Sequence, residues 1–189
     1  MGSNLKQLDD KIDSAVAALN SGGVIAYPTE YCFGLGCNPE DQIAVQRLLK
    51  IKQRQPDQGV ILIASSTAQV EEYVDLQASP HLSNILDSWP GPHTWVLPAR
   101  KKASPWVKGK HAGVAVRVTN NSICKALCSQ YGGAIVSTSA NRHGQPALLD
   151  AKSVVAEMGD ELSYVIDELV GGAQSPSSIK DGLTGQQLR

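Results

Sequence analysis

Four polar side chains stand together at the point where a buried strand is expected to end. Residues 137–141 are Ser-Thr-Ser-Ala-Asn and directly follow the apolar residues 134–136. Ligands of open α/β sheets bind beyond the carboxyl ends of strands, where hydroxyls and free backbone N–H groups can satisfy phosphate oxygens. An ordinary strand-end turn is the structural alternative. The run predicts an anion or nucleotide site whose candidate ligands are Ser137, Ser139 and Asn141.

A second polar segment leaves another expected strand. Residues 27–36 are Tyr-Pro-Thr-Glu-Tyr-Cys-Phe-Gly-Leu-Gly and supply the hydroxyl of Thr29, the carboxylate of Glu30 and two glycines. Because glycine has no Cβ atom, it lets the backbone approach a ligand closely. The segment is either part of a ligand site or a tight loop between a strand and a helix.

Basic residues are concentrated at the end of an expected helix. Arg47, Lys50, Lys52 and Arg54 fall within eight residues that contain no acid. The first two are favoured as partners of the helix dipole, whereas Lys52 and Arg54 lie where the helix ends and can point into a crevice. A charge pair at 4 Å is worth about 4 kcal/mol at an effective dielectric near 20, so two cations aimed at phosphate oxygens would contribute strongly to rate or affinity.

One arginine interrupts an otherwise apolar strand at residues 115–119, Ala-Val-Arg-Val-Thr. A buried charge is costly unless it is paired. Arg117 is therefore expected to meet either an internal acid or a ligand carboxylate, for which its planar guanidinium is suited. We favour the ligand.

The elements that position these residues follow from hydrophobic periodicity and capping residues. Helices are expected where apolar residues recur every three or four positions, with Asn38 and Ser79 as caps and a proline directly after each. Because helices and strands do not alternate strictly, we predict an α/β fold with a mixed sheet and flanking helices. The expected helices are 5–19, 39–51, 67–74, 80–88, 121–131 and 151–158. The expected strands are 24–27, 60–64, 94–97, 113–119, 134–137, 163–166, 177–180 and 186–189.

Length and composition predict a single domain, residues 1–189. A chain of 189 residues that is 42% hydrophobic can fill one core. The sequence has no basic and apolar leader and no long apolar run, so a cytoplasmic protein that does not enter a membrane is expected. The four cysteines match no common zinc spacing, so they are predicted to be reduced structural thiols and no side chain is predicted to bind a metal.

Charge is segregated along the chain although the formal net charge is only −1. Residues 1–46 carry a net charge of −4, residues 47–125 of +6 and residues 126–189 of −3. A basic middle segment in a nearly neutral protein favours a locally bound anion over a general nucleic-acid coat. The sequence lacks the Walker phosphate loop, the dinucleotide glycine pattern, the nucleophile elbow and the His-Glu-x-x-His zinc motif.

Six segments of the chain, taken in order, resemble the threonylcarbamoyl-AMP synthase family, the YrdC-like domain. Each segment alone is a modest signal, but together they span most of the chain in the order of the family. They are Pro-Thr-Glu at 28–30, Lys52-x-Arg54, Trp-Pro-Gly-Pro at 89–92, Val-Arg at 116–117, the run at 137–141 and Ser-Ser-Ile-Lys-Asp at 177–181.

The resemblance implies an enzyme that combines L-threonine, bicarbonate and ATP into threonylcarbamoyl-adenylate with release of pyrophosphate, for t6A modification of tRNA position 37. It also implies a twisted YrdC-like fold with a concave basic face, Mg²⁺ accompanying ATP, and threonylcarbamoyl-transferase proteins of the t6A pathway as partners. By motif position, the residues that would bind ATP are Lys52, Arg54, Ser139, Asn141 and Arg189, the first two being catalytic. Those that would bind threonine or its carbamate are Thr29, Arg117, Ser137 and Ser177.

The chain departs from the family pattern in three respects. Gln55 stands where the family commonly has proline directly after the arginine, and Gln58 occupies a basic or amide position beyond it. Ser178 keeps the hydroxyl of the later motif and loses a methyl group. The second domain of longer relatives is missing, as in the short bacterial form.

Two other functions stay open from the sequence. Five basic residues between positions 100 and 110 surround Trp106 without an intervening acid. This pattern also fits a non-catalytic module that tracks the phosphates of tRNA or double-stranded RNA, and a solvated loop is its structural alternative. The third candidate is a regulatory domain that keeps the substrate pocket but not the reaction.

Overall fold

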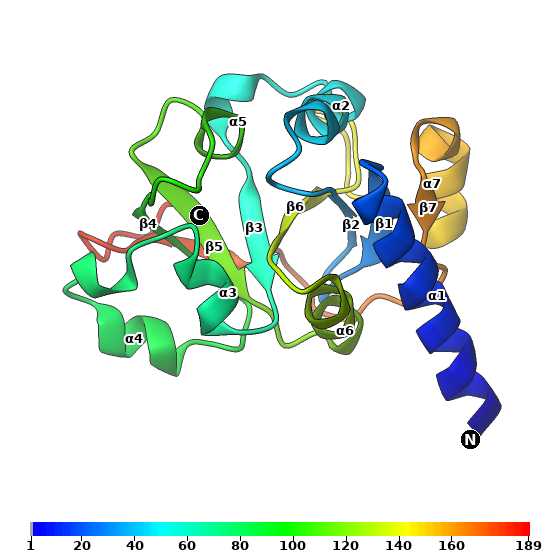
Figure 1. Cartoon of the computed structure of the whole chain (residues 1–189), viewed down its shortest axis with the longest axis horizontal. Helices are drawn as coiled ribbons and strands as arrows, with labels where there is room; N and C mark the ends of the chain where they lie inside the picture. Colours follow the sequence, from blue (N-terminus) through cyan, green and yellow to red (C-terminus); the bar gives the residue numbers. More distant parts are fainter. Residues whose placement is uncertain (1) are drawn as a thin grey trace.

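The chain forms an α/β fold around one sheet of eight strands (Figure 1), and the computed structural model describes residues 2–189. The strand order is β7-β1-β2-β6-β3-β5-β4-β8, with parallel and antiparallel pairs, so the predicted class of a mixed sheet with flanking helices is confirmed. The strands are β1 (Ile25–Pro28), β2 (Phe33–Gly36), β3 (Ile61–Ala64), β4 (His93–Pro98), β5 (Gly113–Val118), β6 (Ile135–Ser139), β7 (Tyr164–Val165) and β8 (Ser178–Asp181). The helices are α1 (Gly2–Asn20), α2 (Gln42–Lys52), α3 (Thr67–Glu71), α4 (Leu82–Asp87), α5 (Pro105–Lys108), α6 (Ser122–Tyr131) and α7 (Ala151–Met158), with 3₁₀ turns at Pro56–Gln58, Leu76–Ala78 and Gly159–Glu161.

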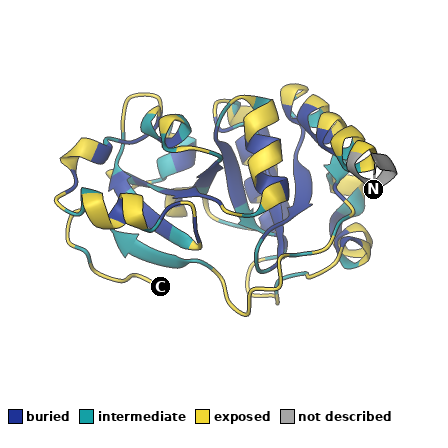
Figure 2. Ribbon diagram, turned by 90° about the horizontal axis from the view of Figure 1, so that it is seen from below, coloured by how far each residue is buried: buried dark blue, intermediate teal, exposed yellow. Residues whose placement is uncertain are grey.

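The sheet separates two apolar layers because successive side chains of a strand point to opposite faces. Ile25, Tyr27 and Ile135 pack with α1 and α6 on one face. The neighbouring side chains Ala26 and Val136 belong to a larger core on the other face, which includes residues of α2 and α7. Figure 2 shows the central strands buried and the helices striped, with one buried and one exposed side.

Helix α2 begins later than the sequence predicts. The predicted cap Asn38 is not the cap, because the carboxylate of Asp41 accepts hydrogen bonds from the backbone N–H groups of Ile43 and Ala44 at 2.9 and 3.1 Å. Asn38 instead accepts from the N–H of Glu40 at 2.9 Å in the preceding turn. Both residue types are good caps, so the sequence alone does not choose between them.

The segment predicted as a loop at residues 28–36 contains a strand. Strand β2 returns along β1 as an antiparallel hairpin in which Tyr27 faces Gly34 and Ile25 faces Gly36. Two of its four residues are glycines, which are poor strand formers. The strand exists because it also pairs with β6 on its other side.

Two predictions near the β8 edge are wrong. Ser79 does not cap α4, which begins two residues later than predicted with His81 at its N-cap. The Ser79 hydroxyl accepts from the N–H of His81 at 3.1 Å, in the turn before the helix, and donates to the carbonyl of Gly182. The predicted strand at 186–189 is a single bridge between Lys180 and Gln187.

The four cysteines are free and buried, as predicted. Burial raises the pKa of the Cys128 thiol to about 12, so the thiol stays neutral near pH 7. None of the helices in residues 2–189 combines the length and the apolar character that a membrane crossing requires.

Candidate functional site

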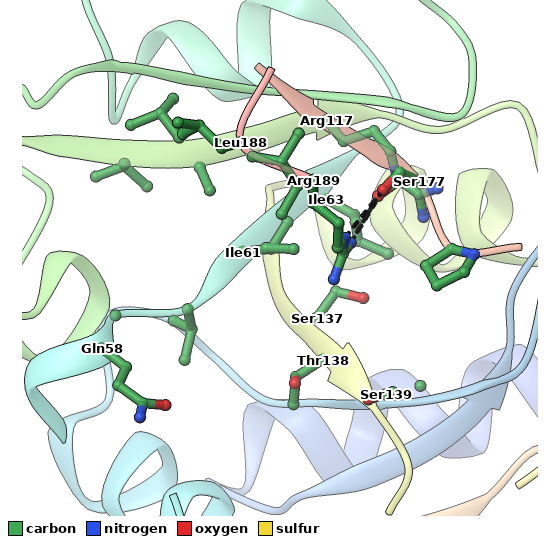
Figure 3. A pocket seen from close by; sticks show the side chains of 18 of the residues that line it. Gln58, Ile61, Ile63, Arg117, Ser137, Thr138, Ser139, Ser177, Leu188 and Arg189 are labelled. Carbon is green, nitrogen blue, oxygen red and sulfur yellow. Dashed lines mark hydrogen bonds between the residues drawn. The ribbon is translucent and has the colours of Figure 1, made fainter. Parts of the chain in front are cut away.

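A cleft of about 850 Å³ lies on the same face of the sheet as α1 and α6 (Figure 3). Ile135 packs under these helices, and the next side chains of β6 on that face, Ser137 and Ser139, line the cleft. Arg117 of β5 lines it as well. Ligand sites in proteins usually measure about 300–1,000 Å³, so the cleft has room for a nucleotide and a small molecule.

Seven of the nine predicted site residues line this cleft: Thr29, Arg54, Arg117, Ser137, Ser139, Ser177 and Arg189. Figure 3 shows that the side chains of Arg117, Ser177 and Arg189 lie together above the hydroxyls of β6. The rest of the wall is mainly apolar and includes Ile61, Val96, Leu97, Val114 and Leu188. The cleft therefore has a polar part, rich in guanidinium groups, and an apolar part.

The other two predicted residues, Lys52 and Asn141, are not among the residues that line the cleft. Lys52 ends α2 and is only 5% exposed. Its ammonium donates to the backbone carbonyls of Ser139 and Asn141 at 2.6 and 3.0 Å, and to the Asn141 side-chain oxygen at 3.1 Å. Burial, and then the charge of Arg54, lower the pKa of Lys52 to about 8.

Arg117 meets an internal acid, the partner that the sequence analysis allowed but did not favour. Its Nη2 atom lies 3.1 Å from Oε2 of Glu30, and the two side chains are 8% and 18% exposed. The Thr119 hydroxyl donates to the other oxygen of Glu30 at 2.7 Å. Burial by itself would raise the pKa of Glu30, but Arg117 and Thr119 together lower it below its ordinary value. Arg117 is thus held in place by a carboxylate while it also lines the cleft.

Arg54 and Arg189 add two guanidinium groups that have no acid partner within residues 2–189. Burial and the charge of Arg189 lower the pKa of Arg54, and burial and Arg117 lower the pKa of Arg189. Arg189 is oriented by the carbonyl of Ser177, to which its Nε and Nη2 atoms donate at 3.2 and 3.1 Å. Like charges that disfavour one another in a cleft are stabilised by a bound anion.

Thr29 is placed by the turn between β1 and β2. Its backbone N–H and its hydroxyl both donate to the carbonyl of Cys32, at 2.9 and 2.8 Å. Cys32 lines the cleft, a position that the sequence did not reveal because a lone cysteine is usually a packing residue. Burial raises the pKa of its thiol to about 11.

The sequence analysis named only Ser177 from the segment 167–177, here called the strap, and missed the rest of it. The strap connects β7 to β8 at opposite ends of the strand order. The N–H of Gly171 donates to the carbonyl of Thr29, and that of Ala173 to the carbonyl of Glu30, both at 2.8 Å. Its last residues, from 175 to 177, line the cleft. The strap has neither helical nor strand periodicity, and its local turn signals are the Gly-Gly pair at 171–172 and the Ser-Pro pair at 175–176.

The basic segment around Trp106 is less available than its sequence indicates. Three of its cations form ion pairs with acids from other segments: Arg100 with Asp75, Lys102 with Glu40 and Glu72, and Lys110 with Asp57. Trp106, in the short helix α5, packs against the core. This arrangement does not favour a loop that tracks nucleic-acid phosphates with a stacking aromatic side chain.

The acids of the cleft are Glu30 and Asp181. Glu30 faces Arg117 and Thr119, and Oδ1 of Asp181 accepts from the backbone N–H groups of Leu183 and Thr184 at 2.8 and 2.9 Å. Across residues 2–189, no three His, Cys, Asp or Glu side chains are grouped so that they could hold a metal ion.

The family model for Sua5/YciO/YrdC proteins, described as "Telomere recombination", matches residues 17–189. A Stenotrophomonas maltophilia protein named threonylcarbamoyl-AMP synthase is 45% identical over 180 residues, which cover 94% of this chain and 97% of the relative. A Vibrio cholerae protein of the same name is 45% identical over 184 residues, 96% of this chain and 98% of the relative. The crystal structure of P. abyssi Sua5 complexed with L-threonine matches with a TM-score of 0.83 at 30% identity, over 90% of this chain and 50% of that one. The chain thus spans about half the length of that Sua5 protein.

Proposed function

Because the chain belongs to the Sua5/YciO/YrdC family, we propose that it is a threonylcarbamoyl-AMP synthase, which joins L-threonine, bicarbonate and ATP and releases pyrophosphate. Its identity with synthases of that name extends over nearly their whole length. The observation that carries the proposal is the polar part of the cleft, where three guanidinium groups lie beside the hydroxyls of β6. Such a surface matches a polyphosphate and a carboxylate together.

The reaction depends on positioning and charge neutralisation, and it needs no protein nucleophile. The threonine nitrogen forms a bond to the carbon of CO₂, or of bicarbonate with loss of water, and releases a proton to give a carbamate. A carbamate oxygen then bonds to the α-phosphorus of ATP while the bond from that phosphorus to the bridging oxygen breaks, and pyrophosphate leaves. Proximity of reactants contributes up to about 7–11 kcal/mol, and fixed cations stabilise the charge on the phosphates.

The charge balance around each arginine supports the division of roles. Arg54 and Arg189 have no acid partner within residues 2–189, so with Ser139 they suit the polyanionic phosphates of ATP. Arg117 is partly neutralised by Glu30 and suits the single carboxylate of threonine or its carbamate. The neighbouring threonine-binding residues would be Thr29, Ser137 and Ser177.

The apolar part of the cleft suits the adenine ring, because its walls offer flat aliphatic contact and little competing hydrogen bonding. Mg²⁺ would enter on the ATP phosphates and keep its waters, with few protein ligands. The negative phosphates of ATP would pair with Arg54 and Arg189, the two guanidinium groups of the cleft that have no acid partner within residues 2–189.

The proposed product is a reactive mixed anhydride, so it must pass to an acceptor before water destroys it. We therefore expect threonylcarbamoyl-transferase proteins of the t6A pathway as partners, with tRNA as the final acceptor. ATP, bicarbonate and tRNA occur together in the bacterial cytoplasm, where we expect the chain to act.

A pyrophosphate-release assay tests the proposal. Purified protein receives ATP, Mg²⁺ and bicarbonate with L-threonine, with L-serine or without an amino acid. We expect release that requires both bicarbonate and an amino acid and is fastest with L-threonine. ATP binding without any pyrophosphate release would instead indicate a regulatory domain. Salt-sensitive RNA binding without nucleotide turnover would indicate the RNA-binding module.

A further inference from the structure

Lys52 differs from the arginines of the cleft because all its hydrogen-bond donors are in use. An ammonium group carries three N–H donors. The three acceptors of Lys52 are the carbonyls of Ser139 and Asn141 and the side-chain oxygen of Asn141, at 2.6, 3.0 and 3.1 Å. A phosphate oxygen could bind Nζ only if one of these bonds broke.

The acceptors all belong to the end of β6, where the sheet gives way to the cleft wall. Oδ1 of Asn141 also accepts from the Ser139 hydroxyl at 2.6 Å. Lys52 therefore fixes the backbone at two carbonyls and fixes the orientation of the Asn141 carboxamide, which in turn orients the Ser139 hydroxyl. Ser139 lines the cleft, whereas the other two do not.

Further bonds tie the last turn of α2 to the same loop. The N–H of His143 donates to the backbone carbonyl of Lys52 at 2.9 Å. The guanidinium of Arg142 donates to the carbonyl of Ile51, and it also pairs with Glu161. The end of α2 and residues 139–143 thus form one connected unit, here called the clamp, with the Lys52 ammonium at its centre.

We propose that Lys52 is a positioning residue: it holds the end of β6 so that Ser139 lines the phosphate part of the cleft, where its hydroxyl turns from Asn141 to a phosphate oxygen when ATP binds, and Lys52 makes no phosphate contact itself. The inference rests on the proposed function, because it concerns the ATP that the cleft would bind. Arg54, two residues further along, would supply the direct cation, since it lines the cleft and its buried Nε atom has no hydrogen-bond partner.

A double-mutant cycle on ATP affinity, measured by calorimetry, distinguishes positioning from direct contact. Effects of residues that act through each other do not add, whereas independent contacts add within a few tenths of a kcal/mol. Lys52→Met and Ser139→Ala are each expected to weaken ATP binding roughly tenfold relative to the wild type. The double variant is expected to bind ATP about tenfold to twentyfold more weakly than the wild type, well short of the roughly hundredfold product of the two. The matched control joins Arg54→Met to Ser139→Ala, for which the two factors should multiply. Multiplying factors in the Lys52 cycle would overturn the proposal.

Amide hydrogen exchange of the ATP-free protein gives a second, nucleotide-independent readout. Lys52→Met is expected to accelerate exchange at residues 139–143, and Arg54→Met to leave it unchanged. Unchanged exchange in Lys52→Met would contradict the clamp. If that variant does not fold, Lys52→Gln, whose side-chain amide still carries N–H donors, replaces it in both measurements. A wild type that binds no ATP would refute the proposed function, whereas an additive cycle in a protein that binds ATP refutes the positioning role alone.

Discussion

At the scale of single residues, the site is governed by which cations are already paired. Glu30 partly neutralises Arg117, and the chain's own oxygens occupy Lys52. Arg54 and Arg189 have no acid partner within residues 2–189, and burial lowers the pKa of each. Repulsion between these two charges in the free protein is relieved when an anion binds. ATP binding to the cleft should therefore raise the free energy of unfolding.

ATP affinity is expected to weaken as the pH rises through about 8, because the pKa of Lys52 lies there. The neutral amine has one donor fewer, and the clamp loosens. The charged or titratable groups that face Lys52 are Arg54, which keeps its charge in this range, and Cys32, whose pKa of about 11 keeps it a neutral thiol. Calorimetric ATP titrations from pH 7 to 9.5 check the prediction.

Lys52→Arg is the control for this titration, because a guanidinium keeps its charge across the range. Equal pH dependence in both proteins would rule out Lys52 as the cause.

The stability of the folded chain should respond to pH in the direction opposite to that of ATP affinity. The pKa of Lys52 is about 8 in the folded chain, lower than the value near 10.4 of an unfolded lysine. Between about pH 8 and 10.4 the unfolded state therefore holds more protons than the folded state. The free energy of unfolding is expected to increase with pH in that window.

At the scale of elements, three strands meet tightly beside the site. Strand β2 lies between β1 and β6. A Cβ atom at Gly36 would lie 2.7 Å from the Val136 carbonyl oxygen and 2.8 Å from the Tyr27 ring. The carbonyl belongs to the strand ladder and cannot move far, so this glycine is required by close backbone approach.

Gly36→Ala is therefore expected to lower the free energy of unfolding by about 1–3 kcal/mol, as overpacking in a core does. Denaturant unfolding at equilibrium measures the change. Gly133→Ala is the matched control, because its Cβ atom would meet only the Tyr131 ring at 3.8 Å. Equal unfolding midpoints for the two variants would show that the strands have room to spread.

The sequence predicts best the elements whose pattern is local. Helix α7 has the predicted bounds, 151–158, and α6 is within one residue of its prediction, because apolar spacing and a single capping residue coincide in each. Strand β2 could not be predicted in this way, since its glycines carry no strand signal and two neighbouring strands hold it. The start of α2 was ambiguous because Asn38 and Asp41 are equally good caps.

The candidate site shows the same contrast between features set by local sequence and features set by tertiary contacts. The position of Ser137 and Ser139 in the cleft follows from strand alternation, which the sequence shows directly. The Lys52 ammonium points to oxygens of Ser139 and Asn141 and not into the cleft. Its direction depends on the side-chain rotamer and on these three tertiary acceptors, which residue spacing in the sequence cannot predict. The ion pair of Arg117 with Glu30 joins residues 87 positions apart, so sequence could name two kinds of partner but not choose the residue.

At the scale of the whole molecule, the cleft is built from both halves of the sheet and bordered by the strap. The strap starts after β7 at one edge and ends before β8 at the other (Figure 1). Midway it is held to the hairpin turn by the backbone bonds of Gly171 and Ala173. The shape of the proposed threonine-binding side of the cleft therefore depends on how closely the strap lies on that turn.

Gly171→Ala is expected to weaken binding of L-threonine by about fivefold, the equivalent of about 1 kcal/mol. A Cβ atom there would lie 3.0 Å from the Cα atom and 3.2 Å from the carbonyl oxygen of Glu30, so the strap must lift from the turn. Calorimetry with L-threonine measures the effect, and Leu169→Ala, at a strap residue that is 89% exposed, is the control. Identical affinities in the two variants would show that the strap is not part of the threonine site.

The last residues of the chain lie along β8, the terminal strand of the sheet. The N–H of Leu188 donates to the carbonyl of Ile179 at 2.7 Å, and the N–H of Ile179 donates to the carbonyl of Arg189 at 3.1 Å. Uncovered strand edges recruit strands from other molecules. The segment that brings Arg189 to the cleft therefore also shields this edge, so trimming it should cause self-association together with the loss of turnover.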